Sequence, residues 1–153
     1  MSELNLKKKT GKLESLTDMP THYCAGCEHG TLTRLIASAM DELGIRERAV
    51  MIDSVGCSVL AYNYLNCDHI VAAHGRAPAV AGGLKRVRPD LMIFTVQGDG
   101  DAVAIGLAEL IYAAKRSTPI TVFLVDNGIY GRTGGQMAPT TLEGQVTTTT
   151  PYG

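Results

Sequence analysis

Two short polar segments in the second half of the chain carry residues that could hold a metal ion and phosphate groups. Gly98 to Asp101 follows one apolar run, and Asp126 to Gly131 follows another. If those runs are parallel strands joined by a crossover helix, Asp99 and Asn127 meet at the same edge of one sheet, where open α/β sheets bind ligands. A carboxylate, an amide and a backbone carbonyl are oxygen ligands of the kind that Mg²⁺ takes when it also holds phosphates.

We therefore predict three Mg²⁺ ligands: the Asp99 carboxylate, the Asn127 side chain and the Ile129 carbonyl. The alternative is that Asp99 and Asn127 are turn residues, which Asp and Asn often are. The glycines beside both favour a ligand site, because a residue without Cβ lets a diphosphate approach the backbone. A GxGxxG fingerprint and the Gly-Lys-Ser/Thr of a P-loop are missing from the sequence, which argues against two other classes of nucleotide site.

The four cysteines are a second source of chemistry. Cys24 and Cys27 form a CxxC pair, and such a pair in a chain without a secretory signal indicates metal binding or redox chemistry. With His22 and His29 beside them, these two thiols could make a zinc site with four local ligands. Cys57 stands in a Gly-Cys-Ser loop that follows a predicted strand, so it belongs to the same sheet edge as Asp99.

Strands and helices alternate along the chain. Apolar runs predict strands at residues 49–52, 70–73, 91–96 and 120–125, and the segments between them predict helices at 31–43, 59–65, 78–87 and 101–116. Runs that are apolar throughout indicate a parallel sheet with helices on both faces, which is an α/β fold. In the last helix we expect one stripe to face the core: Val103, Leu107, Leu110, Ile111 and Ala114.

Length and composition limit the remaining classes. A chain of 153 residues is one domain by size, and we expect a polar arm at 1–20 and the α/β domain at 21–153. The helix–strand pattern fades after Gln136, so the domain is expected to lack its C-terminal part. The net charge of −1 gives no case for nucleic acid, and no apolar run approaches a membrane span. Without an apolar leader, the expected location is the cytoplasm.

The motifs together resemble one family. GDGDAVAIG and DNGIYGRTGGQ, combined with the CxxC pair and the Gly-Cys-Ser loop, are similar to the thiamine diphosphate-binding (beta) subunit of the 2-oxoacid:ferredoxin oxidoreductases. The resemblance implies the thiamine diphosphate-binding fold and Mg²⁺ as its metal. It also implies an enzyme that is active only with partner subunits: a larger alpha subunit for the pyrimidine half of the site, and ferredoxin or a ferredoxin-like subunit.

The resemblance also implies site residues. His74 and Arg76 are the expected catalytic residues. The expected cofactor-binding residues come from four segments of the chain: Val55, Gly56, Cys57 and Ser58; His74, Gly75 and Arg76; Gly98, Gly100 and Asp101; and Tyr130, Gly131, Arg132 and Thr133. These are expectations of the family pattern, and the spacing of the residues does not establish them.

A 4Fe–4S cluster is implied as well, since it usually takes four thiolates. Cys24, Cys27 and Cys57 match three of the family's ligands, and no cysteine follows Cys67 to match the fourth. The missing ligand lies beyond Gly153, or Cys67 supplies it, or the cluster is incomplete. We expect the missing ligand to lie beyond Gly153, and we regard Cys67 as a thiol that takes no part in the site.

The implied reaction converts a 2-oxoacid and coenzyme A to an acyl-CoA and CO₂, with electrons passing through the cluster to ferredoxin. Two alternatives remain open at this point. One is a thiamine enzyme without redox chemistry, a decarboxylase or carboligase. The other is a non-catalytic fragment that binds zinc through its His and Cys residues.

Overall fold

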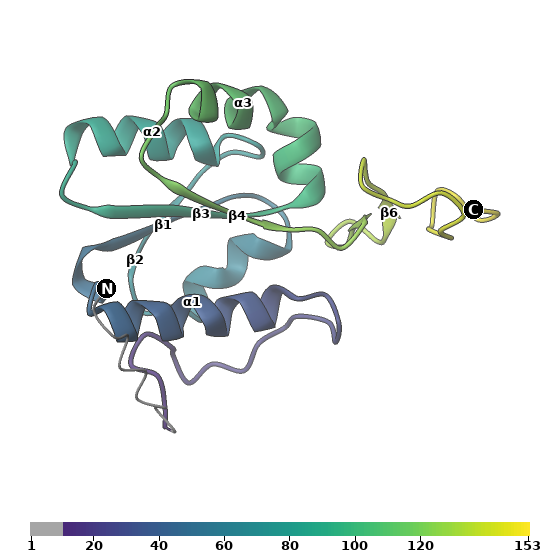
Figure 1. Ribbon diagram of the computed structural model, residues 1–153. Coiled ribbons are helices and arrows are strands. Elements are labelled where there is room, and N and C mark those ends of the chain that lie inside the picture. The colour runs from purple at the N-terminus through teal and green to yellow at the C-terminus, as the bar shows by residue number, and fades with distance from the viewer. Residues whose placement is uncertain (1–10) are drawn as a thin grey trace, which may run out of the picture.

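A parallel four-stranded sheet in the order β2-β1-β3-β4 lies at the centre of the computed structural model, which describes residues 11–153 (Figure 1). The strands are β1 (Ala49–Asp53), β2 (Asp68–Val71), β3 (Met92–Gly98) and β4 (Thr121–Val125). Each of the three strand pairs is parallel. The predicted α/β class is confirmed, and the carboxyl ends of all four strands point to one edge of the sheet.

Helices cover both faces of this sheet (Figure 1). On one face lie α1 (His29–Leu43) and the 3₁₀ helix η2 (Cys57–Asn63), over a core that includes Ile36, Met40 and Met51. On the other face lie α2 (Ala77–Val87) and α3 (Leu107–Lys115). Small alanines of α2, Ala77 and Ala81, are fully buried and let this helix pack closely on β1 and β3.

The predicted ends of two helices follow from local chemistry. Gly44 ends α1 in the left-handed region, with a φ of 61°, which is the usual role of a glycine after a helix. Pro78 stands in the first turn of α2, where its missing N–H leaves no hydrogen bond unmade. One short 3₁₀ helix that was not predicted, η1 (Arg46–Arg48), leads directly into β1.

The crossover between β3 and β4 differs from the prediction in two ways. It begins with a π-helical turn, η3 (Asp101–Ile105), and continues as α3 after Gly106. The predicted core stripe is wrong: no residue of α3 is buried, and Leu107 and Ile111 are 43% and 55% exposed. The reason is position, because α3 packs on its neighbour α2 at the β4 edge of the sheet, and no described residue covers its outer side.

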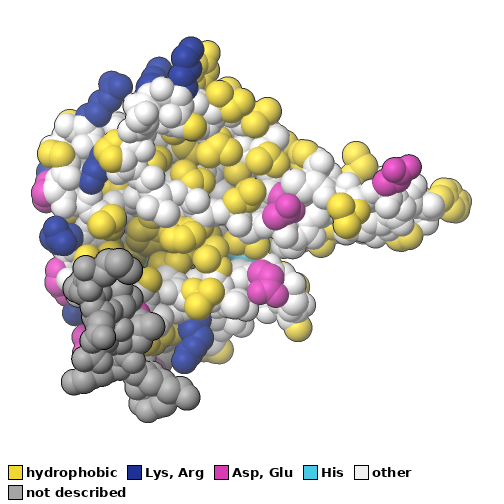
Figure 2. Space-filling model, viewed as in Figure 1, with side chains coloured by type: hydrophobic (Ala, Val, Ile, Leu, Met, Phe, Trp, Pro, Cys, Tyr) yellow, Lys and Arg dark blue, Asp and Glu magenta, His cyan; other side chains and the backbone are white. Residues whose placement is uncertain are grey.

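Apolar side chains of α3 and of the β4 edge consequently reach the surface. Figure 2 shows apolar side chains gathered over the end of the molecule that carries α3. Exposed members from this region are Ile105, Leu107, Ile111, Tyr112 and Leu124. Beyond β4 the chain forms a small antiparallel pair, β5 (Ile129–Tyr130) and β6 (Gln136–Met137), and then an arm that projects from the sheet (Figure 1).

Residues 11–17 pack on the domain. Leu13 belongs to the core on the α1 face, and Ser15 is fully buried, where its hydroxyl donates to Asp41 at 2.6 Å. The second half of the predicted arm 1–20 is therefore partly built into the domain, while residues 1–10, with the Lys7–Lys9 run, lie outside the described residues. None of the helices at residues 11–153 has the length and hydrophobicity that a membrane span requires.

Candidate functional site

A hollow of about 110 Å³ opens at the carboxyl ends of the strands, where the predicted polar segments come together. Fourteen of the residues that line it were named from the sequence: Val55, Gly56, Cys57, His74, Gly98, Asp99, Gly100, Asp101, Asn127, Ile129, Tyr130, Gly131, Arg132 and Thr133. A further lining residue, His29, comes from the start of α1. The parallel order of the sheet produces this meeting, because each of these loops follows a strand or begins a helix at the same edge.

Asp99 is held firmly at the floor of the hollow, with 2% of its surface exposed. Its Oδ1 accepts the Gly100 N–H at 2.7 Å, and its Oδ2 accepts the Gly128 N–H and the Thr140 hydroxyl, each at 2.7 Å. These bonds tie the end of β3 to the loop after β4. A carboxylate oxygen has two lone pairs, so Oδ1 keeps one that a cation can use.

The loop after β4 also lines the hollow. Asn127 and Ile129 line the hollow together with Arg132, whose side chain is exposed and forms no ion pair within residues 11–153. The two predicted metal-binding segments thus line the same hollow, and the hydrogen bond from the Gly128 N–H to Asp99 joins them. An unpaired guanidinium beside a carboxylate and an amide gives the site the means to hold a metal ion and its anionic partner together.

Gly100 is required for a reason that the sequence did not reveal. A Cβ at this position would lie 2.0 Å from a ring carbon of Tyr130. The Tyr130 hydroxyl also donates to the Gly100 carbonyl at 3.4 Å, which is a long hydrogen bond. In this structure the tyrosine ring therefore occupies the space that the missing side chain leaves.

Asp101 joins three segments of the site through one buried carboxylate. Its Oδ1 accepts the Ser54 hydroxyl at 2.8 Å, the Gly75 N–H at 2.7 Å and Nδ1–H of His74, while its Oδ2 accepts the Gln97 amide at 2.5 Å. These donors come from the ends of β1 and β3 and from the loop after β2. Because the carboxylate already accepts four hydrogen bonds, its role in the structure is to position these loops.

The loop after β2 carries the predicted catalytic pair, His74 and Arg76, and the structure separates them. His74 lines the hollow, and Asp101 fixes its Nδ1 as the protonated nitrogen, which leaves Nε2 as the nitrogen that can exchange a proton. Arg76 does not line the hollow, because its guanidinium pairs with Glu109 at the surface. Gly75 is buried between them and does not line the hollow either.

Of the three predicted cluster cysteines, Cys57 lines the hollow, while Cys24 and Cys27 lie in the loop before α1 and do not. The Cys27 N–H donates to the Cys24 carbonyl at 3.2 Å, which closes the CxxC turn. Burial, the Cys27 thiol and the Cys24 thiol raise the pKa of Cys57, and Arg132 opposes them.

In the described part of the chain, no three His, Cys, Asp or Glu side chains lie so that they could hold one metal ion between them. A 4Fe–4S cluster binds its cysteine thiolates through its separate iron atoms, so its ligands need not surround one ion. The three thiols are the type of ligand that such a cluster binds, and they would supply three of its four usual ligands. For the local zinc alternative, His22 Nδ1 contacts the Tyr64 hydroxyl at 2.5 Å, and in residues 11–153 His22, Cys24, Cys27 and His29 are not grouped around one ion.

His29 is the site residue that the analysis of the sequence assigned only to the zinc alternative. It is 4% exposed, its Nδ1 donates to the Cys27 carbonyl at 3.2 Å, and its Nε2 has no partner among the described residues. Burial lowers the pKa of His29, which favours the neutral ring, and the residue lines the hollow. The signal in the sequence was its place at the start of a helix that follows the CxxC pair.

Two other predicted residues lie elsewhere. The Ser58 hydroxyl is buried in η2 and donates to the Ser54 carbonyl at 3.4 Å, so it does not line the hollow. Cys67, one of the alternatives for the fourth cluster ligand, faces His69 and lines a separate hollow with Arg46 and Glu47.

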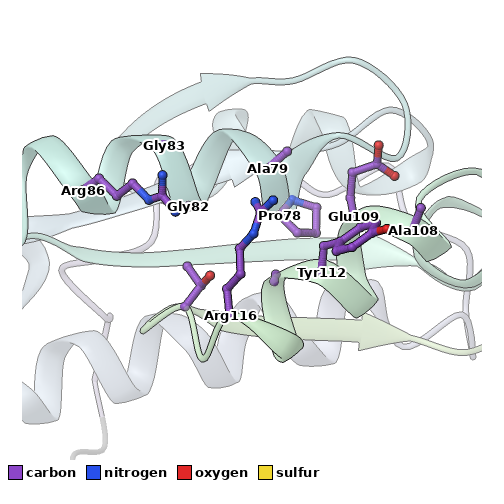
Figure 3. A pocket seen from close by; sticks show the side chains of 11 residues that line it. Pro78, Ala79, Gly82, Gly83, Arg86, Ala108, Glu109, Tyr112 and Arg116 are labelled. Atoms are coloured by element: carbon purple, nitrogen blue, oxygen red, sulfur yellow. The ribbon is translucent and has the colours of Figure 1, made fainter.

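A larger hollow of about 340 Å³ lies between α2 and α3 (Figure 3). Its walls are mostly small residues, including Gly82, Gly83 and Ala108, and its charged side chains are Arg86, Glu109 and Arg116. In Figure 3 these side chains extend from the two helices on one face of the sheet. None of the residues predicted for cofactor or metal binding lines it, so the smaller hollow at the strand ends is the candidate site.

The fold and the site together match a known class of protein. Residues 54–153 match the family model described as the thiamine pyrophosphate enzyme, C-terminal TPP binding domain. This match covers most of the chain and includes both predicted Mg²⁺-binding segments. The chain belongs to this family.

Within the family, its relatives include subunits of 2-oxoacid oxidoreductases. The chain is 59% identical to the ketoisovalerate oxidoreductase subunit VorA of Methanothermobacter thermautotrophicus, over 87% of this chain and 28% of that protein. It is 42% identical to the 2-oxoglutarate synthase subunit KorB of Archaeoglobus fulgidus, over 88% of this chain and 51% of that protein. The chain thus spans about half the length of these relatives or less.

A solved structure agrees with these relatives. The 2-oxoglutarate:ferredoxin oxidoreductase from Magnetococcus marinus, with 2-oxoglutarate, coenzyme A and succinyl-CoA bound, superposes with a TM-score of 0.85 and 38% identity. The superposition covers 91% of this chain and 48% of that one. The predicted family resemblance is confirmed by all three comparisons.

Proposed function

We propose that this chain is the thiamine diphosphate-binding part of a 2-oxoacid:ferredoxin oxidoreductase, which converts a 2-oxoacid and coenzyme A to an acyl-CoA and CO₂ and passes electrons to ferredoxin. The observation that carries the proposal is the hollow at the strand ends, where Asp99, Asn127 and Cys57 lie together. A metal–diphosphate site and a thiol of a redox centre in one hollow fit an enzyme that couples decarboxylation to electron transfer.

The Mg²⁺ and diphosphate would be held by residues of two loops. Asp99, Asn127 and the Ile129 carbonyl are the oxygen ligands, and Arg132 supplies positive charge for the diphosphate. His29 also lines the hollow, and its buried Nε2 has no partner among residues 11–153, so it could accept a hydrogen bond from a bound group. When bound, thiamine diphosphate supplies the carbanion chemistry that decarboxylates a 2-oxoacid.

The chain's own residues contribute position and proton exchange. Asp101 holds His74 with its Nδ1 protonated, so that Nε2 is the atom that gives or takes a proton at the hollow. Arg76 acts through its pair with Glu109, which anchors the same loop to α3. Cys24, Cys27 and Cys57 would hold the iron–sulfur cluster that takes single electrons, with a fourth ligand from outside residues 1–153.

The size of the hollow supports a shared site. At about 110 Å³ it is well below the roughly 300–1,000 Å³ of a complete small-molecule pocket. Within residues 11–153 no glutamate lines it, and its two aspartates are already hydrogen-bonded. A partner subunit would therefore provide the pyrimidine half of the site, and the exposed apolar side chains of α3 offer surface for protein contact.

The test is reduction of a viologen dye by the native assembly, purified without oxygen and offered a panel of 2-oxoacids with and without coenzyme A. Higher identity to VorA than to KorB makes ketoisovalerate the first acid to try and 2-oxoglutarate the second. We expect reduction that depends on one acid and on coenzyme A. No reduction by any acid, in an assembly shown to contain thiamine diphosphate and iron, would contradict the proposal.

A matched pair of variants tests the metal site separately from activity. Asp99→Asn removes the proposed carboxylate ligand, whereas Asp126→Asn makes the same change at an exposed position on the same sheet edge. We expect the first to weaken thiamine diphosphate binding in Mg²⁺ by at least ~10-fold, measured by calorimetry, and the second to leave it unchanged. Equal affinities would remove Asp99 from the proposed ligand set.

A further inference from the structure

Three side chains outside the thiamine site form a relay from the end of β1 to the surface. Asp53, the last residue of β1, is fully buried, and its Oδ2 lies 2.7 Å from Nδ1 of His69 on β2. On the other side of that ring, Nε2 lies 3.3 Å from the Leu65 carbonyl and 3.6 Å from Sγ of Cys67. The carboxylate, the imidazole and the thiol are thus arranged in series.

The neighbours of His69 determine its charge. Nδ1 faces a carboxylate and Nε2 faces a backbone carbonyl, and both of these groups accept hydrogen bonds. A proton on each ring nitrogen satisfies both contacts and makes the ring an imidazolium; burial raises the pKa of Asp53, and the hydrogen bond and charge of His69 oppose that rise. Burial opposes this charge, but the hydrogen bonds to Asp53 and Cys67 outweigh it and raise the pKa of His69 to about 10.

An imidazolium beside a thiol favours the thiolate, which is the nucleophilic form of cysteine. Other charged groups also lie around the relay. Arg46 and Glu47 lie beside Cys67 and pair with each other at 2.7 Å, and Asp68 is exposed on the neighbouring position. On the inner side, burial raises the pKa of the Tyr23 phenol, so it stays neutral next to Asp53.

Cys67 can be reached by a small reagent. It is partly exposed and lines a hollow of about 230 Å³ with Arg46, Glu47, Asn66 and Asp68. No residue of this hollow lines the candidate thiamine site. The thiol stands just before β2, at the end of the strand opposite to the loop that carries His74.

We propose that Cys67 is a reactive thiolate, activated by His69 and Asp53, and that it is a modification site for soft electrophiles, among them low-molecular-weight disulfides. In the disulfide reaction, the Cys67 sulfur attacks one sulfur of the small disulfide and a new S–S bond forms. The original S–S bond breaks, and the other half leaves as a thiolate that takes a proton from water. The small disulfide is the oxidant, and nothing else is consumed.

The experiment uses the native assembly, held without oxygen, and limiting iodoacetamide between pH 6 and 8.5. Mass spectrometry reads alkylation of Cys67, with fragment ions to separate it from Cys57, since no Lys or Arg stands between the two. The same cysteine in urea-unfolded protein is the reference. At pH 6.5 we expect the native thiol to react on the order of 10-fold faster than the unfolded one, and its rate to change little with pH.

Variants separate activation from mere exposure. Cys67→Ser removes the signal, and Asp53→Asn/His69→Gln removes both charges together, so that no unpaired charge is left buried. We expect the double variant to show the steep pH dependence of an ordinary thiol and to lose the 10-fold advantage. In a parallel arm, 2-hydroxyethyl disulfide should give a mixed disulfide at Cys67 in the native protein at pH 6.5.

If the double variant does not fold, the pH dependence of the Cys67 alkylation rate in the unaltered protein still tests the proposal. A native rate that rises about tenfold per pH unit below pH 8, as for an ordinary thiol, overturns the proposal. So does a Cys67 that reacts only after unfolding. Because thiamine and substrate play no part in the reaction, these outcomes are independent of the proposed enzyme activity.

Discussion

At the scale of single residues, Asp101 shows how one buried carboxylate can organise a site. It accepts hydrogen bonds from the ends of β1 and β3 and from the loop that carries His74. Hydrogen bonds to charged groups contribute more than neutral ones, and a buried donor left without its acceptor is costly. The residue therefore affects both the stability of the domain and the geometry of the hollow.

We expect Asp101→Asn to lower the free energy of unfolding by ~2 kcal/mol, because an amide replaces an oxygen that accepts from these donors. Thermal unfolding of the assembled protein measures this. Asp126→Asn, the same change at an exposed position, should stay within about 0.5 kcal/mol of the unaltered protein. If the two variants unfold alike, Asp101 does not have the organising role that its contacts indicate.

The pair of Asp53 and His69 makes a pH prediction at the same scale. The folded pKa of His69, about 10, lies above its ordinary value of 6.5. The stability that protonated His69 contributes is therefore complete below about pH 6.5 and is lost as the pH rises through about 10. We expect Tm to fall from pH 6.5 to 9.5 more steeply in the unaltered protein than in Asp53→Asn/His69→Gln. Parallel pH profiles would show that His69 is not charged.

At the scale of elements, the loop after β2 is fastened to the start of α3 by two glycines. Gly75 has a φ of 78°, and a Cβ there would lie 2.7 Å from the Gly106 backbone nitrogen. A Cβ at Gly106 would lie 2.5 Å from the Gly75 carbonyl oxygen. Backbone atoms cannot move aside as a side chain can, so this close approach sets the position of His74.

Gly75→Ala should therefore destabilise the protein by at least ~2 kcal/mol, since it adds strain at a positive φ to a backbone clash. Gly83→Ala is the matched control, because this helical position has free space for a Cβ and a glycine in a helix costs up to ~1 kcal/mol relative to alanine. Thermal unfolding should show a lower Tm for the first variant and an equal or higher Tm for the second. The reverse order would mean that the loop is not fixed by this contact.

At the scale of the whole molecule, the site has the features of one half of a shared site. The hollow is small, and no glutamate of residues 11–153 lines it; Glu109, for example, pairs with Arg76. On the same side of the sheet as this pair, α3 leaves Leu107 and Ile111 exposed. Both features suit a chain that works in contact with other protein.

We accordingly expect the chain produced alone, supplied with thiamine diphosphate, Mg²⁺ and a 2-oxoacid, to reduce no viologen. The same chain produced together with its partner subunits should be active. Side-by-side assays under identical anaerobic conditions check this. Turnover by the chain alone would mean that residues 1–153 contain a complete site.

The sequence alone was enough to predict the parallel sheet and most of the hollow. Continuous apolar runs followed by Gly-Asp-Gly and Asp-Asn-Gly encode strand ends, and in a parallel sheet all such ends meet at one edge. Fourteen of the named residues line one hollow for that reason. The family resemblance also rested on these short sequence motifs.

The tertiary structure decided the features that sequence patterns do not predict. The burial and the contact partners of a side chain depend on neighbours that are distant in the chain. The apolar period of residues 103–114 indicated a core face, yet α3 lies at the β4 edge and leaves that face exposed. Asp101 was expected among the cofactor-binding residues, and the structure adds that its carboxylate joins loops from three strands. Cys67 was expected to be a thiol without a function. Only the register of β1 against β2 places His69 and Asp53 in series with it.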